Sequence, residues 1–139
     1  MERRAAKDNF DEKLRLLREQ ISTAEISLDI WVRLNDRDEE LAGALDRFRG
    51  FFVPTLLAIQ TLFFIKLGIA TEAKDRRQPS IIEILRLIEE EPTLAPGLNI
   101  AGLRARLSEI NDHIRRVHRA RDRRFAHFDT NMGPPSVEL

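Results

Sequence analysis

The sequence predicts an all-α fold, an antiparallel four-helix bundle that becomes five helices if a proline interrupts the second one. Apolar residues recur at alternating spacings of three and four along most of the chain, which is typical of helices with one buried face. The chain has few valines and no tyrosine, so it is poor in residues that favour strands. Its 139 residues can bury one core but not two, and we expect a single helical domain over 1–139.

The first predicted helix runs from about residue 5 to about residue 34. Its apolar side chains form one seam: Phe10, Leu14, Leu17, Ile21, Ala24, Leu28 and Trp31. This seam predicts a coiled-coil-like packing surface, with Trp31 in the core. Asn35, Asp36 and Asp38 then supply turn and cap side chains before the next helix begins.

The second predicted helix carries its apolar side chains on one side: Leu41, Leu45, Phe48, Phe52, Leu56, Ile59, Phe63 and Leu67. Pro54 lies inside it, and we expect a kink there because the carbonyl of Gly50 loses its donor. Residues 51–70 also form the longest apolar stretch, with Lys66 as their only charge. Their length just reaches the ~20 residues of a membrane span. Pro54, Gln60 and Lys66 favour instead a helix buried in the bundle, with part of it at a dimer interface.

We expect a cytoplasmic protein that does not cross a membrane. The N-terminus has charge but no apolar segment behind it, so no secretory signal is predicted. The chain has no cysteine and three histidines, which excludes disulfides and thiolate ligands and leaves no convincing metal site. We therefore expect no metal and no cofactor.

A polar segment over 73–79 reads as a loop that leads into a short third helix. Ser80 and Glu83 have the spacing of a capping box at its start, and a short apolar run follows. After a connector over 92–97, the last predicted helix extends over roughly 98–127. Its buried seam consists of Ile100, Leu103, Leu107, Ile110, Ile114 and Val117.

Arg121 occupies the next position of that seam, at the centre of the apolar stripe by a rotation of ~100° per residue. A guanidinium that cannot reach water has to be paired or used in chemistry. One interpretation is a helix end that protrudes beyond the core, where Arg121 pairs with a carboxylate such as Asp122 or Asp129. The other interpretation is functional, and the residues around Arg121 favour it.

The segment around Arg121 is strongly basic, although the chain has no net charge. Residues 115–124 hold six arginines against one aspartate, a charge of +5 in ten residues. A local basic segment of this kind can bind a polyanion. The expected contacts to RNA phosphates come from Arg115, Arg116, Arg119, Arg123 and Arg124. The alternative is a solvated basic face, because three of these arginines point away from the seam.

Residues 121–129 read RDRRFAHFD, in which an arginine and a polar residue are followed by a histidine after five intervening residues. This segment resembles the signature of the HEPN superfamily. It looks most like the AbiU-like abortive-infection branch, where an Arg-Asp-Lys start and an Ala-His-x-Asp end are typical. Arg123 stands where that branch has lysine, which keeps the charge. Only these nine residues are specific, while the helical pattern is similar over most of the chain.

The resemblance implies a metal-independent endoribonuclease of the toxin or abortive-infection kind that works as a homodimer. His127 would take the proton from a ribose 2'-hydroxyl, since a neutral imidazole is a suitable base near pH 7. Arg121 would hold the scissile phosphate, and Asp122 would orient Arg121 or the opposing histidine. The products would carry a 2',3'-cyclic phosphate and a 5'-hydroxyl. An antitoxin such as a nucleotidyltransferase is a possible partner.

Arg121 and His127 do not share a face on a regular helix. Six residues rotate the side chain by ~600°, which leaves the two about 120° apart. Either the helix is distorted near Phe125, or Arg and His side chains of two subunits converge in a composite site, which we favour. His113 and His118 are expected at the surface or at its boundary, without a catalytic role.

Two other functions are compatible with the same residues. The main alternative is a non-catalytic HEPN module that binds RNA, a nucleotide or a nucleotidyltransferase partner. The other is a helical dimerisation domain that binds no nucleic acid and tolerates substitution of Arg121 and His127. The presence of both motif residues favours the enzyme, since a scaffold has no need of them.

Overall fold

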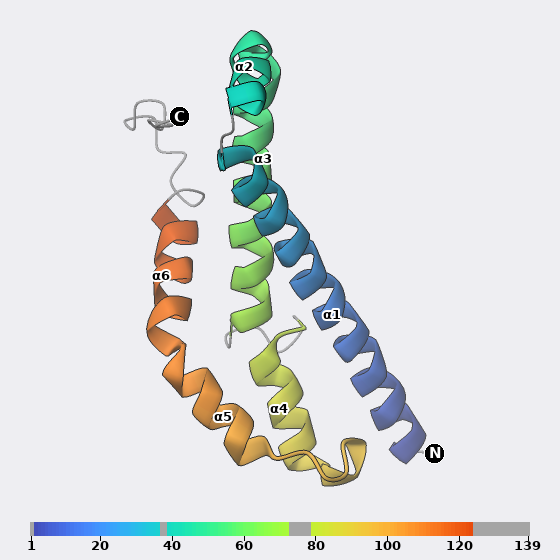
Figure 1. Cartoon of the computed structure of the whole chain (residues 1–139). Coiled ribbons are helices and arrows are strands. Elements are labelled where there is room, and N and C mark those ends of the chain that lie inside the picture. The colour runs from blue at the N-terminus through green and yellow to red at the C-terminus, as the bar shows by residue number, and fades with distance from the viewer. Residues whose placement is uncertain (1, 37–38, 73–78, 124–139) are drawn as a thin grey trace.

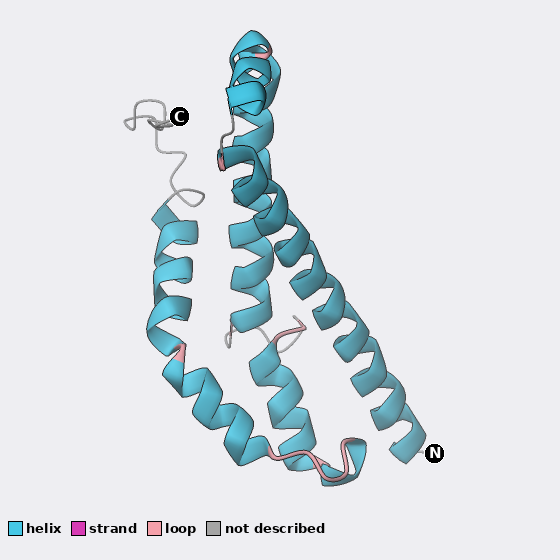
Figure 2. Ribbon diagram, in the orientation of Figure 1, coloured by secondary structure: helices cyan, strands magenta, loops and turns pink. Residues whose placement is uncertain are grey.

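The computed structural model describes residues 2–36, 39–72 and 79–123, and all regular elements in these ranges are helical (Figures 1 and 2). The all-α prediction is therefore confirmed for this part of the chain. The elements are α1 (Glu2–Asn35), α2 (Glu39–Arg47), α3 (Arg49–Thr71), α4 (Ile81–Glu90), a 3-10 turn η1 (Pro92–Leu94), α5 (Ile100–Glu109) and α6 (Asn111–Arg121).

The helices form three columns that run antiparallel to their neighbours (Figure 1). The long helix α1 packs along α3, and the chain reverses between them through α2. The next helix, α4, lies beyond the C-terminal end of α3 and also contacts α1. The third column consists of α5 and α6, of which α6 packs against α3.

Two interruptions give the described ranges six α-helices, where four or five were expected. The first lies at Phe48 (φ −113°, ψ 32°), and Pro54 lies inside the continuous helix α3. Pro54, where we expected a kink, therefore lies within a helix that continues over Arg49–Thr71.

The second interruption lies at Ile110, which ends α5 and precedes α6 (φ −95°, ψ 4°). The last helix was expected to be continuous there. The change of backbone direction leaves the Ile110 side chain 47% exposed, although its position belongs to the predicted seam. The seam residues on either side of it, Leu107 and Ile114, are partly buried as predicted.

The core lies between α1, α3 and α4, where Phe10, Leu17, Ala70, Ile84 and Ile88 form one cluster of buried side chains. The predicted seam of α1 is confirmed at Phe10, Leu17 and Ala24. Further along α1 it is wrong at Leu28, which is 40% exposed, while Ser27 is buried instead. The Ser27 hydroxyl donates to the Thr23 carbonyl at 2.7 Å, so this polar group is satisfied within its own helix. Trp31, predicted in the core, is partly buried.

Half of the predicted capping box at the start of α4 is confirmed, since the Ser80 hydroxyl accepts the backbone N–H of Glu83 at 3.2 Å, whereas the Glu83 carboxylate bonds to other partners. The Glu83 side chain is buried and bonds to two cations. Its carboxylate accepts from Lys13 Nζ at 2.8 Å and from Nε and Nη2 of Arg86, both at 2.9 Å. The bonds from Arg86 and Lys13 lower the pKa of Glu83 to about 2. The bond between Lys13 and Glu83 therefore joins α1 to α4.

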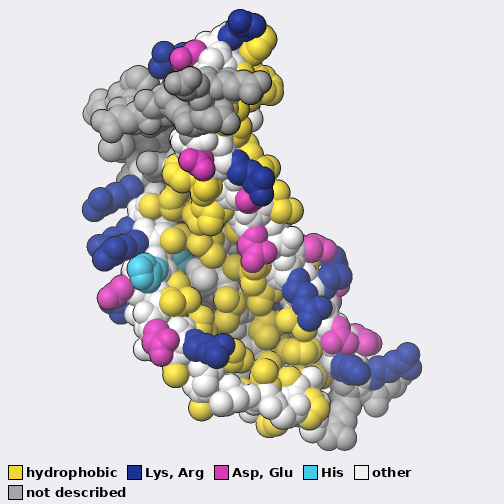
Figure 3. Space-filling model, viewed as in Figure 1, with side chains coloured by type: hydrophobic (Ala, Val, Ile, Leu, Met, Phe, Trp, Pro, Cys, Tyr) yellow, Lys and Arg dark blue, Asp and Glu magenta, His cyan; other side chains and the backbone are white. Residues whose placement is uncertain are grey.

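The helix expected at the centre of the bundle is largely uncovered within one chain. By length and composition α3 could cross a membrane, with a mean hydropathy of 1.8 in its most apolar window, and 11% of that window is buried. The burial predicted for this segment is therefore wrong for the single chain. The reason is the arrangement of the columns, because α4 continues beyond α3 rather than covering another side of it. Figure 3 shows the apolar surface that results, a band of hydrophobic side chains between charged flanks.

Candidate functional site

Arg121 lies where the end of α6 meets the end of α3, and its side chain is 20% exposed, as its seam position predicts. Two carboxylates bind its guanidinium. Nη1 and Nη2 donate to the two oxygens of Glu72 at 3.0 and 3.4 Å. Nε and Nη2 donate to Asp122 Oδ1 at 3.0 and 2.9 Å. All three guanidinium nitrogens therefore have a carboxylate partner.

The Arg121 side chain crosses α3 at Gly68. A Cβ atom on residue 68 would lie 3.0 Å from both Cδ and Nη1 of Arg121, closer than ordinary van der Waals contact. Gly68 is buried, and what covers it is this arginine. The missing side chain thus provides the path by which Arg121 reaches Glu72, one turn further along the same column.

A second polar contact joins the same two helices one turn before Arg121. Thr71 Oγ1 lies 2.9 Å from His118 Nε2 and also donates to the carbonyl of Leu67 at 2.8 Å. The roles of donor and acceptor in the Thr71–His118 bond depend on which ring nitrogen of His118 carries the proton. His118 lies at the boundary of the surface, as expected, and His113 is exposed.

Exposed arginines follow the outer side of α6. They are Arg115, Arg116 and Arg119, with Arg123 just beyond the helix, and Arg115, Arg119 and Arg123 are the three predicted to point away from the core. Basic side chains gather along this flank of the molecule in Figure 3, beside the apolar band. A row of guanidiniums on one helix face can follow a phosphate backbone without reading its sequence.

The regular α-helix ends at Arg121, and residues 122 and 123 continue it with a wider π-helical turn. Arg124 and His127, which the sequence assigned to RNA binding and catalysis, lie outside the described residues, as do Phe125 and Asp129. The described site therefore contains Arg121 and Asp122 of the predicted catalytic set.

The three groups that bond to one another at Arg121 carry a negative charge together. One guanidinium faces two carboxylates, which leaves a sum of −1. The bond from Glu72 is the largest of the effects that raise the pKa of Arg121, so this cation persists at any physiological pH. An anion that binds Arg121 has to take the place of a carboxylate oxygen.

Two surface hollows lie away from Arg121. One is an open groove of about 450 Å³ between α4 and α5, lined by Ile81, Leu85, Leu103 and Leu107 with Arg106 at its edge. The other is a pocket of about 10 Å³ where α2 meets α3, which has room for about one water molecule. Among the residues that the structure describes, no group of three or more His, Asp or Glu side chains could hold a metal ion.

Sequence reasoning missed Glu72, Gly68 and Thr71. Glu72 is 49 residues from Arg121, and Gly68 appeared only as part of an apolar stretch. The sequence offers one signal for Thr71 and Glu72. They are the first pair of polar residues after the apolar stretch, and such a pair indicates the end of a helix. Nothing in their spacing relates them to α6.

Comparisons with protein-family models, curated proteins and solved structures find no match to this chain. Its function is therefore argued from the residues of the site and from the motif that begins at Arg121.

Proposed function

We propose that this chain is a metal-independent endoribonuclease of the toxin or abortive-infection kind, as the resemblance of residues 121–129 to the HEPN signature implies. His127 removes the proton from a ribose 2'-hydroxyl, and the 2'-oxygen attacks the adjacent phosphorus. The bond from phosphorus to the 5'-oxygen breaks, which leaves a 2',3'-cyclic phosphate and a 5'-hydroxyl. Arg121 stabilises the charge that develops on the phosphate oxygens. The enzyme acts in the cytoplasm and needs no membrane.

The observation that carries this proposal is the position of Arg121. It lies at the inner edge of a row of exposed arginines, and its guanidinium is held over Gly68 by Glu72 and Asp122. The outer row of arginines supplies attraction for the RNA backbone, which depends on charge and not on sequence. An oriented guanidinium beside that row is suited to hold one phosphate in a fixed geometry.

In this scheme the two carboxylates have different roles. Asp122 is 61% exposed and adjacent to Arg121 in the chain, so it can turn into solvent when a phosphate arrives. Glu72 is 28% exposed and belongs to another helix. It acts as a positioning residue that keeps Arg121 oriented while the phosphate replaces Asp122.

The active form is a homodimer in which the motifs of two subunits contribute to each site. This follows from the helical rotation between Arg121 and His127, which separates them by about 120° if the helix is regular. A two-fold axis near the ends of the last helices would bring an arginine of one copy towards a histidine of the other.

A non-catalytic HEPN module is the second candidate, and one observation favours it. Every nitrogen of the Arg121 guanidinium already has a carboxylate partner, which is what a structural ion pair between α3 and α6 requires. Such a module would bind RNA, a nucleotide or a nucleotidyltransferase antitoxin through its arginine row, without cleaving RNA.

Cleavage of RNA by the wild type distinguishes the two candidates, and replacement of Arg121 by alanine tests whether cleavage depends on that residue. The matched control is Arg104→Ala, since Arg104 donates through Nε and Nη2 to Glu89 at 2.6 and 2.7 Å in an exposed pair between α5 and α4. The nuclease predicts that purified wild type and Arg104→Ala cleave RNA in the presence of EDTA, whereas Arg121→Ala does not. Binding of RNA without cleavage by the wild type would contradict the nuclease and favour the module.

A further inference from the structure

The proposed cleavage leaves the source of one proton open. The 2'-hydroxyl gives its proton to His127, and the bond from phosphorus to the 5'-oxygen breaks. The 5'-oxygen is then a strongly basic alkoxide, and it becomes a hydroxyl only when an acid gives it a proton. A side chain that donates this proton as the bond breaks contributes about 10²–10⁴-fold to the rate. The site therefore needs a proton donor close to Arg121, which holds the phosphate in this scheme.

The three groups that bond to one another at Arg121 are not suited to this step. Glu72 and Asp122 accept bonds from the guanidinium as carboxylates, so they have no proton to give. The guanidinium keeps its own proton, because the bond from Glu72 raises the pKa of Arg121. The side chain that proteins use most often as a general acid near neutral pH is histidine.

His118 is the histidine that the structure places beside Arg121. The two residues are three apart in α6, which separates them by ~60° of rotation and ~4.5 Å along the axis. Both side chains reach α3. Arg121 Nη1 donates to Glu72 at 3.0 Å, and His118 Nε2 lies 2.9 Å from Thr71 Oγ1. Because Thr71 and Glu72 are consecutive, the imidazole and the guanidinium end at neighbouring residues of α3.

The contact with Thr71 leaves the second ring nitrogen of His118 available. Thr71 Oγ1 gives its hydrogen to the carbonyl of Leu67 at 2.8 Å, and its lone pairs remain. In a protonated imidazole both nitrogens carry a hydrogen, so Nε2 donates to Thr71. Nδ1 has no hydrogen-bond partner among the residues that the structure describes. Its hydrogen is therefore the one that a bound substrate can take.

The charges around His118 are compatible with an imidazolium. Arg121, Glu72 and Asp122 together carry a charge of −1. A protonated His118 beside them brings the sum to zero. When a phosphodiester takes the place of Asp122, one negative charge replaces another and the sum stays at zero. The same protonated form thus suits the free site and the occupied one.

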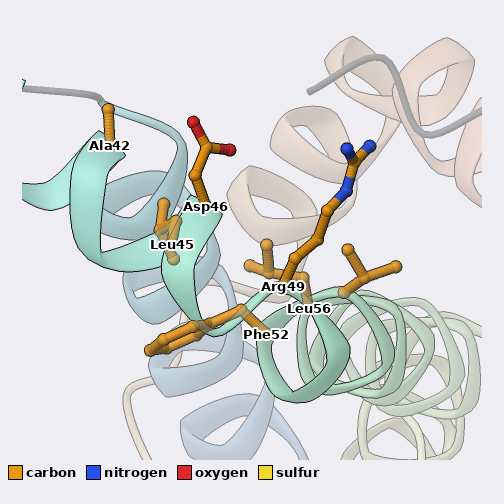
Figure 4. Close-up of a pocket in the computed structure, with 7 residues that line it drawn as sticks. Ala42, Leu45, Asp46, Arg49, Phe52 and Leu56 are labelled. Carbon is orange, nitrogen blue, oxygen red and sulfur yellow. The ribbon is translucent and has the colours of Figure 1, made fainter.

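Other described groups that can carry a proton lie away from Arg121. His113 is exposed and lies about 12 Å back along α6. Lys66 of α3 is two residues from Gly68, so it points about 160° away from the side that Arg121 covers. The pocket between α2 and α3, with Asp46 and Arg49 among its lining, lies towards the opposite end of α3 (Figure 4).

We propose that His118 is the general acid of this reaction. Its Nδ1–H gives a proton to the 5'-oxygen as the bond from phosphorus breaks, while His127 takes the proton of the 2'-hydroxyl. One bond to phosphorus forms and one breaks, and one proton is gained and one lost by the RNA. The inference rests on the proposed function, because it adds a residue to the same reaction. From the sequence alone His118 was expected without a catalytic role, since Thr71 is 47 residues away.

An RNA with a better leaving group tests this role. Sulfur replaces the bridging 5'-oxygen at a mapped cleavage site, and the thiolate leaves without a proton because a thiol is a much stronger acid than an alcohol. Wild type and the control His113→Ala should cleave both RNAs. His118→Ala should cleave ordinary RNA about 100-fold more slowly or worse, and the sulfur RNA at close to the wild-type rate. His127→Ala should cleave neither RNA, because the 2'-hydroxyl still needs a base.

His118→Gln separates the loss of the acid from the loss of the contact with α3. The glutamine amide can bond to Thr71 but does not act as an acid. This variant should show the same selective loss as His118→Ala, with the helical circular dichroism of the wild type.

Two results would overturn the inference and leave the nuclease standing. One is wild-type cleavage of ordinary RNA by His118→Ala, which would assign the proton to another group, such as a second His127 in the dimer. The other is an equal loss on both RNAs in His118→Ala and His118→Gln, which would show a purely structural role. A wild type that cleaves neither RNA would contradict the nuclease itself, and the role of His118 would be refuted with it.

Discussion

Arg121 and Gly68 are in contact across α6 and α3, and any Cβ on residue 68 would lie 3.0 Å from the arginine's Cδ and Nη1. Glycine inside a helix is usually a weakness, by about 1 kcal/mol relative to alanine. Here it gives room to the guanidinium that the proposed chemistry requires. Because residue 68 has no side chain, Arg121 lies this close to α3 without being displaced.

Gly68→Ala should therefore destabilise the protein, although alanine is the better helix former. The added methyl displaces Arg121 from Glu72, and we expect a loss of about 1–2 kcal/mol in the free energy of unfolding. Gly43→Ala in α2 is the control, because nothing lies within 4 Å of a Cβ there. The free energy of unfolding of Gly43→Ala should rise by up to about 1 kcal/mol. Urea unfolding followed by circular dichroism measures both, and an equal gain in the two variants would contradict the account.

Glu72→Gln should weaken the contact between α3 and α6 and lower the rate of RNA cleavage. The pair is partly buried, and the loss of its charge should cost about 1–2 kcal/mol of stability. Glu89→Gln, in the exposed pair with Arg104, should cost less than about 1 kcal/mol and leave cleavage unchanged. If Glu72 positions Arg121, the variant should lower kcat more than it raises KM. A purely structural role would lower stability and leave the kcat of the folded fraction unchanged.

The Glu83 cluster predicts a loss of stability in acid. The pKa of Glu83 is lowered from 4.5 to about 2 in the folded chain, so the folded state favours the charged carboxylate. Its contribution is complete above pH 4.5 and is lost as the pH falls towards 2. The difference in unfolding free energy between wild type and Glu83→Gln should shrink over this interval. A difference that stays constant between pH 6 and pH 2 would show that Glu83 is not held in this ion pair.

Binding of RNA by the arginine row should depend on salt. Each phosphate contact with single-stranded RNA contributes about 0.7 to the slope of log affinity against log salt concentration. Replacing Arg115, Arg116 and Arg119 by alanine should reduce that slope, whereas replacing Arg15, Arg18 and Arg33 on α1 should not. Affinity that does not vary with salt in the wild type would argue against this electrostatic surface.

The periodicity of the sequence was sufficient for the helical class and for the position of Arg121, but not for the breaks at Phe48 and Ile110. Both depend on local spacing, because residues three and four apart share a helix face whatever the rest of the chain does. The partly buried Arg121 and the exposed Arg115 and Arg119 confirm the predicted faces of the last helix. The alternative that Arg121 pairs with Asp122 is also confirmed.

Contacts between distant segments could not be predicted in this way. Glu72 meets Arg121 only because α4 and α5 carry the chain back along α3, and no local pattern encodes that path. From the sequence alone, Arg121→Ala is predicted to leave the bundle intact, since Arg121 lies beyond the apolar stripe. The bonds to Glu72 indicate instead that this variant loses part of the contact between α3 and α6.

The central claim is tested most directly by the chemistry of the RNA ends. Purified protein is incubated with total cellular RNA in EDTA, and the termini of the fragments are mapped for wild type, His127→Ala and the control His113→Ala. The account predicts 2',3'-cyclic phosphate and 5'-hydroxyl ends from wild type and His113→Ala, and no fragments from His127→Ala. Cleavage that persists in His127→Ala, or that appears only when magnesium is added, would contradict it.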